Sequence, residues 1–119
     1  TALVPELKIA VFPDPYSGIN VQLTTKNFTF DPKNASLKHQ NNHGHAHIYV
    51  DGVKLNRVYS DWYHHSGLQA GEHTVRVTLN TNDHKQYFAN NQPIEASQTF
   101  TTTGTKIIHV HEDGEIHLH

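Results

Sequence analysis

Two amino acids are missing from this chain altogether, cysteine and methionine. Without cysteine, the 119-residue chain has no disulfide framework, no thiolate metal site and no cysteine nucleophile. Without methionine, it has no thioether ligand of the kind that soft Cu(I) prefers. The sequence also lacks an apolar run long enough to cross a bilayer, so we expect no membrane span. Any metal site in this chain must therefore use nitrogen and oxygen ligands.

The chain also lacks a large excess of charge of either sign. Lysine and arginine number 9 against 11 acidic residues, which gives a net charge of −2 with the histidines neutral. Nucleic-acid partners require a basic face, so we expect none here. What the chain has instead is 12 histidines, and full protonation would move the charge from −2 to +10 (−2 plus 12). The net charge is therefore unusually sensitive to pH near the histidine pKa.

Short segments of alternating polarity, separated by Pro, Asn, Asp and Gly, make up most of the sequence. This pattern is typical of an antiparallel β-sandwich or barrel, and helical periodicity is absent over any useful length. No linker or internal repeat divides the chain, so we expect one all-β domain over residues 1–119. The predicted strands are residues 7–12, 19–25, 27–30, 45–50, 53–59, 71–79 and 95–103, followed by a terminal ribbon over 106–119.

Four histidines fall within the last eleven residues, as two His-x-His pairs around an acidic turn: His109, His111, His117 and His119. A two-residue Asp-Gly turn would leave the two pairs on opposite faces. A three-residue loop with Gly114 in a left-handed conformation places His109 opposite His117 and gathers four aliphatic side chains on the other face. Burial of one apolar face determines strand register, so we prefer this loop. It predicts a hairpin with four imidazoles on one side.

The four imidazoles of this ribbon make it the first candidate metal site. Neutral imidazole suits Zn(II), Cu(II) and Ni(II). Residues i and i+2 on a strand point the same way with Cα atoms about 6.6 Å apart, within reach of one ion. The alternative is an exposed polar strand face or a tag-like tail without a native role.

A second histidine cluster begins at His43. Residues 45–50 alternate cleanly, which predicts that His45, His47 and Tyr49 share one strand face. If the strand begins by residue 42, His43 joins that face, and Gly44 permits a close backbone approach. We predict a metal site here. The alternative is a solvated strand face on which Tyr49 packs against a cross-strand partner.

Histidines outside that strand are candidates to complete the second site. His64 and His65 are adjacent, so on a strand their side chains diverge and only one can join. His84 lies in the long polar connection over residues 80–93, where functional residues concentrate. His73 lies on the apolar face of its strand, and we expect it to be a buried histidine satisfied by a backbone carbonyl.

One block of the sequence resembles a known class of domain. The Gly-His-Ala-His block over residues 44–52 is followed by Arg57-Val58-Tyr59, by Trp62-Tyr63-His64, and by the segments 71–77 and 82–84. Together they resemble small bacterial extracytoplasmic domains with an immunoglobulin-like β-sandwich fold, some of them suspected of handling copper. The resemblance covers roughly residues 4–100. It implies an immunoglobulin-like antiparallel sandwich, a periplasmic or secreted location, and metal binding.

A shorter likeness lies in the terminal ribbon. His109-Val110-His111-Glu112 is similar to a stretch of the copper–zinc superoxide dismutases in which both histidines bind copper. The match spans only these few residues, and the cysteines and the zinc-ligand loop of that family are absent. We interpret it as chemistry shared by two histidines on a strand.

These patterns favour a non-enzymatic metal-binding protein that carries or buffers Cu(II) or Zn(II) outside the cytoplasm. Imidazole suits both ions, and we expect copper first and zinc second. No catalytic motif stands out, which favours a role without catalysis. One alternative is a copper redox enzyme of the superoxide dismutase type. Another is an assembly module that forms a homo-oligomer through the ribbon under the control of metal or pH. The predicted ligands are His43, His45, His47, His64, His84, His109, His111, His117 and His119.

Overall fold

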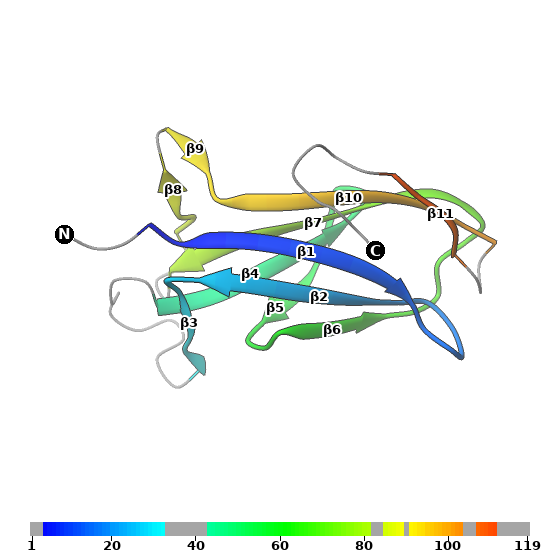
Figure 1. The fold of residues 1–119 in the computed structure, drawn as a ribbon, viewed down its shortest axis with the longest axis horizontal. Coiled ribbons are helices and arrows are strands. Elements are labelled where there is room, and N and C mark those ends of the chain that lie inside the picture. The colour runs from blue at the N-terminus through cyan, green and yellow to red at the C-terminus, as the bar shows by residue number, and fades with distance from the viewer. Residues whose placement is uncertain (1–3, 33–42, 82–84, 90, 104–106, 112–119) are drawn as a thin grey trace.

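The protein is an all-β sandwich, as the alternating pattern predicts (Figure 1). The computed structural model describes residues 4–32, 43–81, 85–89 and 91–103, and the backbone of 107–111. Every element in these residues is a strand. In chain order they are β1 Glu6–Pro13, β2 Ile19–Lys26, β3 Thr29–Phe30, β4 His43–Val50, β5 Val53–Val58, β6 Trp62–His65, β7 Gly71–Thr81, β8 Phe88–Ala89, β9 Gln92–Pro93, β10 Glu95–Thr102 and β11 Ile107–His111.

Two sheets form the layers of the sandwich. The smaller sheet has the order β1-β2-β6, and it lies in front in Figure 1. The larger sheet has the order β11-β10-β7-β4-β3, with β5 also paired to β4. Pairing is antiparallel throughout except between β3 and β4, which run parallel for two residues. β8 and β9 form a separate small hairpin beyond the end of β7.

The core lies between the two sheets, where alternate residues of each strand meet. β7 contributes Val75, Val77 and Leu79, and β4 contributes Ala46 and Ile48, all fully buried. They pack against the inner face of the smaller sheet and against Phe100 of β10. The inward side chains from the smaller sheet and its loops are Ile9, Val11, Ile19, Val21, Leu23 and Leu68. Because β1, β2, β4 and β7 each bury one apolar face in this core, the register of these strands is determined.

The hairpin between β4 and β5 follows from its turn residues. Asp51 and Gly52 both have positive φ, at 53° and 82°, and Val50 pairs directly with Val53. A two-residue turn of this kind requires positive φ at both positions, which Asp-Gly provides at low cost. This turn places β5 beside β4 and so brings the end of β5 next to the histidines of β4.

The structure differs from the sequence prediction in two places. The segment Trp62–His65 is a strand, β6, that the alternation did not predict. β7 continues to Thr81, and part of the expected polar connection over 80–93 forms β8 and β9. In the predicted ribbon, residues 107–111 form β11, which pairs antiparallel with β10. Residues 112–119 lie outside the described residues, and the predicted terminal hairpin lies there with them.

Candidate functional site

Two histidines of β4 converge on the outer face of the larger sheet. Ala46, Ile48 and Val50 point into the core, so His45 and His47 point to the opposite face, as the alternation predicts. Their Nε2 atoms lie 3.0 Å apart and their ring centroids 4.8 Å apart. At this distance one ring nitrogen donates a hydrogen bond to the other. The two imidazoles form one unit, which we call the histidine pair.

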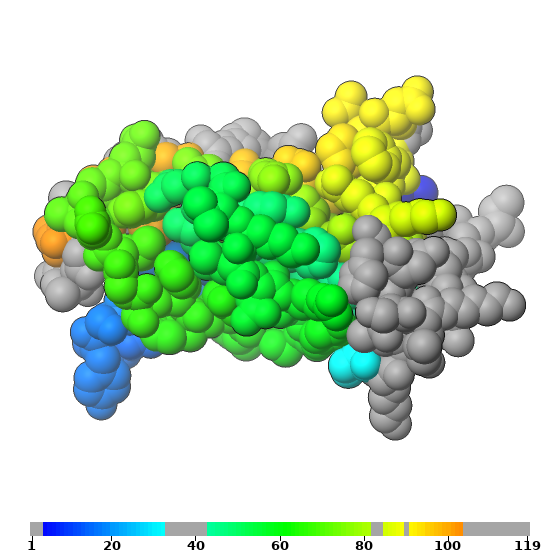
Figure 2. All heavy atoms as spheres, turned by 180° about the vertical axis from the view of Figure 1, so that it is seen from behind, coloured from blue at the N-terminus to red at the C-terminus, as the bar shows by residue number. Residues whose placement is uncertain are grey.

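The histidine pair is buried although it lies on the outer face of a sheet. His45 is 0% exposed and His47 is 5% exposed. Seen from behind, residues of β4 and β5 occupy the middle of this face (Figure 2). Polar groups removed from water in this way are costly unless they find partners, and here each imidazole meets the other. The sequence prediction placed these side chains together but treated a solvated face as the alternative, and that alternative is wrong for this pair.

Two residues of β7 and the residue that follows β5 lie beside the histidine pair. In the register of β4 with β7, His47 lies opposite Thr78 and His45 lies opposite Asn80. Both β7 residues are buried, and Thr78 Oγ1 donates a hydrogen bond of 2.8 Å to Asn80 Oδ1. On the other side, the Tyr59 ring packs against His45 with 5.3 Å between ring centroids. The pair is therefore bordered by polar side chains on β7 and by an aromatic ring on the side of β5.

Gly44 allows this arrangement through its close approach to β7. A Cβ atom at position 44 would collide with the backbone carbonyl oxygen of Asn80. Only glycine therefore fits immediately before His45 while β4 and β7 remain paired. This confirms the sequence interpretation of Gly44 as a point of close backbone approach.

His43 has a different partner from the other two histidines of β4. Its Nδ1 lies 3.1 Å from Asp31 Oδ2, and its backbone carbonyl accepts a 2.9 Å hydrogen bond from the Tyr87 hydroxyl. Asp31 follows β3, which pairs with the first residues of β4. The short parallel pairing of β3 thus brings a carboxylate to His43. The shared strand face had predicted that His43 would join His45 and His47. In the structure the His43 ring contacts Asp31 instead.

His64 lies in the other sheet and does not approach the histidine pair. It is on β6, opposite Asn20 of β2, and its Nδ1 is 2.8 Å from Asn20 Oδ1. Asn20 in turn donates to Asp14, whose Oδ2 is 3.5 Å from the same His64 nitrogen. Hydrogen bonds from the backbone N–H of Tyr16 and from Asn20 hold the pKa of Asp14 below its ordinary value. His64 belongs to this exposed polar cluster on the smaller sheet.

The remaining predicted ligands lie where the structure describes no side chains. His84 falls in the gap at residues 82–84, and His117 and His119 fall beyond residue 111. For His109 and His111 only the backbone is described, and β11 pairs them with Thr101 and Thr99 of β10. The predicted terminal metal site therefore stays a prediction.

A further histidine is held by two acceptors at the other end of β7. His73 Nδ1 lies 2.6 Å from Asp51 Oδ2, and His73 Nε2 lies 2.7 Å from the carbonyl oxygen of Gln69. Both ring nitrogens face acceptor oxygens, so this geometry stabilises the imidazole in its cationic form. Burial acts to lower the pKa of His73, but the hydrogen bonds to Asp51 and Gln69 and the Asp51 charge outweigh it and raise that pKa. The expected backbone-carbonyl partner is confirmed, and the carboxylate is an addition that sequence reasoning missed.

The neighbouring imidazole on β6 has the opposite shift. Burial lowers the pKa of His65, and the positive charges of His64 and His73 lower it further. His64 and His65 point to opposite faces of β6, as expected for adjacent strand residues.

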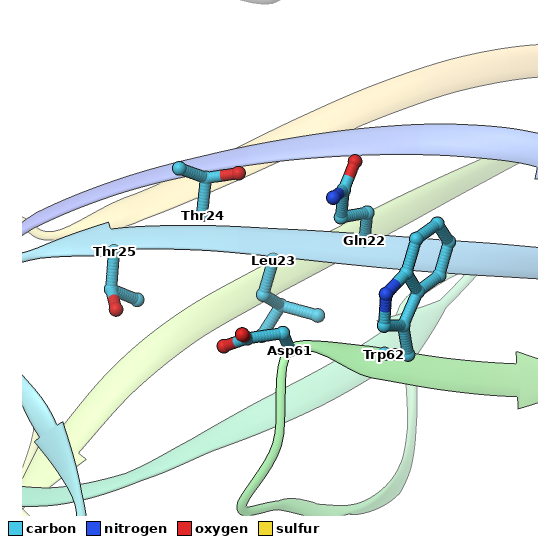
Figure 3. A pocket seen from close by; sticks show the side chains of 6 residues that line it. All are labelled: Gln22, Leu23, Thr24, Thr25, Asp61 and Trp62. Atoms are coloured by element: carbon cyan, nitrogen blue, oxygen red, sulfur yellow. The ribbon is translucent and has the colours of Figure 1, made fainter.

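A separate hollow of about 370 Å³ lies on the smaller sheet where β6 begins (Figure 3). There Asp61 accepts a 2.7 Å backbone hydrogen bond from Leu23, and the half-exposed Trp62 ring leans against Phe12. In Figure 3 the indole of Trp62 stands beside the side chain of Gln22. The residues that line this hollow are Gln22, Leu23, Thr24, Thr25, Asp61 and Trp62. It contains one carboxylate and no imidazole, so it is distinct from the histidine pair.

Two convergent nitrogens provide half of a four-coordinate site for Zn(II) or Cu(II). Among the residues that the structure describes, no group of three or more His, Asp or Glu side chains gathers around one point. Nor does any helix in that part of the chain have the length and apolarity needed to cross a membrane. Comparisons with protein-family models, with curated proteins and with solved structures find no match. The chemistry of the site must therefore be argued from its own atoms.

Proposed function

We propose that this protein binds a divalent transition metal between the Nε2 atoms of His45 and His47. We propose Cu(II) as the first ion and Zn(II) as the second, carried or buffered outside the cytoplasm. The observation that supports this proposal is the 3.0 Å separation of two buried imidazole nitrogens. The extracytoplasmic location rests on the resemblance of the Gly-His-Ala-His block alone.

The separation of the two nitrogens determines the angle that they would subtend at a shared ion. With metal–nitrogen bonds of about 2.05 Å, the observed 3.0 Å corresponds to an angle of about 94°. A tetrahedral ion would require a separation of about 3.3 Å with the same bonds. Cu(II) prefers tetragonal coordination, in which neighbouring ligands lie about 90° apart. The separation therefore lies within about 0.3 Å of what either ion would need, and we place Cu(II) first because nitrogen sites generally bind it more tightly than Zn(II).

The surroundings of the histidine pair favour slow exchange of a bound ion. Because His45 and His47 are buried, an ion between them would exchange its water shell for fixed nitrogen ligands. Thr78 and Asn80, which lie opposite the two histidines, surround the pair with polar groups. Polar groups around metal ligands restrict ring orientation and adjust affinity. We expect an ion at this site to exchange more slowly than one held by histidines on an exposed strand face.

The test separates this site from the terminal histidines. We define the ribbon variant as the full chain with alanine at His109, His111, His117 and His119. Calorimetric titration of the ribbon variant with Cu(II) should give one tightly bound equivalent, and adding His45→Asn and His47→Asn should abolish it. His64→Ala in the same background is the matched control, because this histidine is exposed on the other sheet. It should leave the stoichiometry unchanged.

Two further measurements keep the result interpretable. Circular dichroism and thermal unfolding establish that each variant is folded before its metal content is compared. Electron paramagnetic resonance of the Cu(II) form should show coupling to two imidazole nitrogens, and one after the single substitution His47→Asn. If the folded ribbon variant binds no stoichiometric Cu(II) or Zn(II), the proposal is wrong.

A further inference from the structure

The histidine pair leaves a question about ligand number. A Cu(II) or Zn(II) site needs at least four donors, and the pair supplies two. Among the described residues no third His, Asp or Glu joins them, and the chain has no cysteine. The hydroxyl, phenol and amide oxygens of this part of the chain are then candidates for a further protein ligand. The side chain packed directly against the pair carries one.

Tyr59 follows the last residue of β5 and lies beside the histidine pair. β5 pairs with β4 so that Val58 lies opposite Ala46, and the ring of the next residue, Tyr59, packs against His45. Their side chains therefore share the outer face of the sheet, and the two rings are tilted by 46° with centroids 5.3 Å apart. Tyr59 is thus the aromatic neighbour that covers one side of the pair.

The Tyr59 hydroxyl is buried, and it has no hydrogen-bond partner among the residues that the structure describes. A buried hydroxyl without a partner is destabilising, and native proteins rarely retain one without a reason such as a bound water or ion. Phenylalanine would cover His45 equally well without this penalty. A buried oxygen without a partner, on the ring that packs against His45, is the observation that points to a ligand.

We propose that Tyr59 is the third protein ligand of the metal held by His45 and His47, and that it binds as a phenolate. This inference rests on the proposed metal-binding function. On binding, the Tyr59 O–H bond breaks, the proton passes to water, and an oxygen lone pair forms the bond to the ion. The phenolate cancels one of the two positive charges that the ion brings into a buried site, which two neutral imidazoles cannot do. An anionic oxygen with two imidazoles is a donor set that suits tetragonal Cu(II).

The spectrum of the Cu(II) form tests this assignment. A phenolate bound to Cu(II) gives a charge-transfer band in the visible region, which histidine ligands alone do not give. We expect the band in the Cu(II)-loaded ribbon variant, and we expect it to disappear when Tyr59→Phe is added. Competition with a chelator should then show a 10- to 100-fold weaker affinity for Cu(II), because one charged ligand is lost.

A second tyrosine provides the matched control. Tyr49 is on the same face of β4, but its ring lies 4.0 Å beneath the guanidinium carbon of Arg76. Tyr49→Phe should therefore keep both the band and the affinity. The metal-free Tyr59→Phe variant should unfold at the same or a higher temperature than the parent, since it removes a buried hydroxyl without a partner. That result would exclude a loss of fold as the cause of weaker binding.

The outcomes distinguish this inference from the function on which it rests. If the ribbon variant binds one Cu(II) but shows no charge-transfer band, or if the band survives Tyr59→Phe, then Tyr59 is not a ligand and the metal site itself stands. Unchanged affinity in Tyr59→Phe would likewise overturn the assignment and leave a bound water as the partner of the hydroxyl. If no Cu(II) binds, both proposals fail together.

Discussion

Removal of the Asp51 charge should abolish a pH-dependent part of the stability of this fold. Asp51 closes the β4–β5 turn, where its Oδ1 accepts a 2.9 Å hydrogen bond from the backbone N–H of Thr74 and its Oδ2 contacts His73. Asp51→Asn retains a side chain that tolerates positive φ and can still accept from Thr74. It removes only the charge that holds the His73 imidazole in its cationic form.

The direction of the effect follows from the two pKa shifts. The pKa of His73 is raised above 6.5, so its contribution is fully present below pH 6.5 and is lost as the pH rises through the raised value. For Asp51, burial acts to raise the pKa, but the hydrogen bonds from His73 and Thr74 outweigh it and lower the pKa below 3.8. Its contribution is therefore present above pH 3.8 and is lost in stronger acid. The ion pair stabilises the fold most between these two pH values.

The expected magnitude follows from exposure. The His73 side chain is 14% exposed and that of Asp51 is 47% exposed, so the pair is only partly shielded from solvent. Exposed ion pairs contribute about 0.2–1 kcal/mol and charged hydrogen bonds about 1.5–3 kcal/mol. We therefore expect about 1 kcal/mol at pH 5.5, close to the upper end of the exposed range. For a chain of this length, that corresponds to a shift in melting temperature of about 3–6 °C.

The assay is a double-mutant cycle with Asp51→Asn, His73→Gln and the combined variant. Urea unfolding at pH 5.5 and pH 8.5 gives the coupling free energy of the two side chains at each pH. The cycle is needed because the pKa of His65 is lowered, so this imidazole destabilises the fold in acid and gives the parent a slope of opposite sign. We expect coupling of about 1 kcal/mol at pH 5.5 and a clearly smaller value at pH 8.5. Equal coupling at both pH values would refute the assignment of a cationic His73.

Three further predictions concern the core, the close approach of two strands and the terminal histidines. Phe100 is fully buried, so Phe100→Ala should lower the free energy of unfolding by about 3–5 kcal/mol in urea titrations, and a loss below about 1 kcal/mol would contradict the packing. Gly44→Ala should cost about 1–3 kcal/mol or more, because its Cβ meets the Asn80 carbonyl; a thermal melt that matches the parent would show that β4 and β7 are less closely packed than described. The terminal histidines are His109, His111, His117 and His119. Alanine at all four should remove at least one metal equivalent in calorimetric titrations with Cu(II) and Zn(II) while the sandwich stays folded. Unchanged stoichiometry would contradict the terminal site.

Most of the fold could be predicted because the strands of the larger sheet have one apolar face. In β7, Val75, Val77 and Leu79 alternate with polar residues, and the structure buries that set in the core. The Asp51-Gly52 turn could also be predicted, since few other dipeptides tolerate two successive positive φ angles. Local rules sufficed wherever one face of a strand is apolar.

The strand β6 could not be found by the same rules. Its four residues are Trp62, Tyr63, His64 and His65, and neither face of this segment is clearly apolar. It is a strand because β2 offers an edge, with Val21 opposite Tyr63 and Gln22 opposite Trp62. Pairing of this kind is a tertiary effect that no local pattern records. The position of His64 on the smaller sheet, away from the histidine pair, follows from that pairing.

The candidate site shows the same limit at the level of single side chains. Alternation placed His43, His45 and His47 on one face, but it could not say which of them would meet. His43 contacts Asp31, because the parallel pairing of β3 brings a carboxylate to the start of β4. His45 and His47 contact each other, and they are buried on a face that sequence patterns treat as solvent-exposed. Burial of polar side chains on an outer face costs desolvation free energy, so it requires a compensating interaction. A bound metal ion would provide one, because exclusion of water strengthens the attraction between the ion and its ligands. The burial of the pair, more than the number of histidines in the chain, is therefore the feature that a metal site explains best.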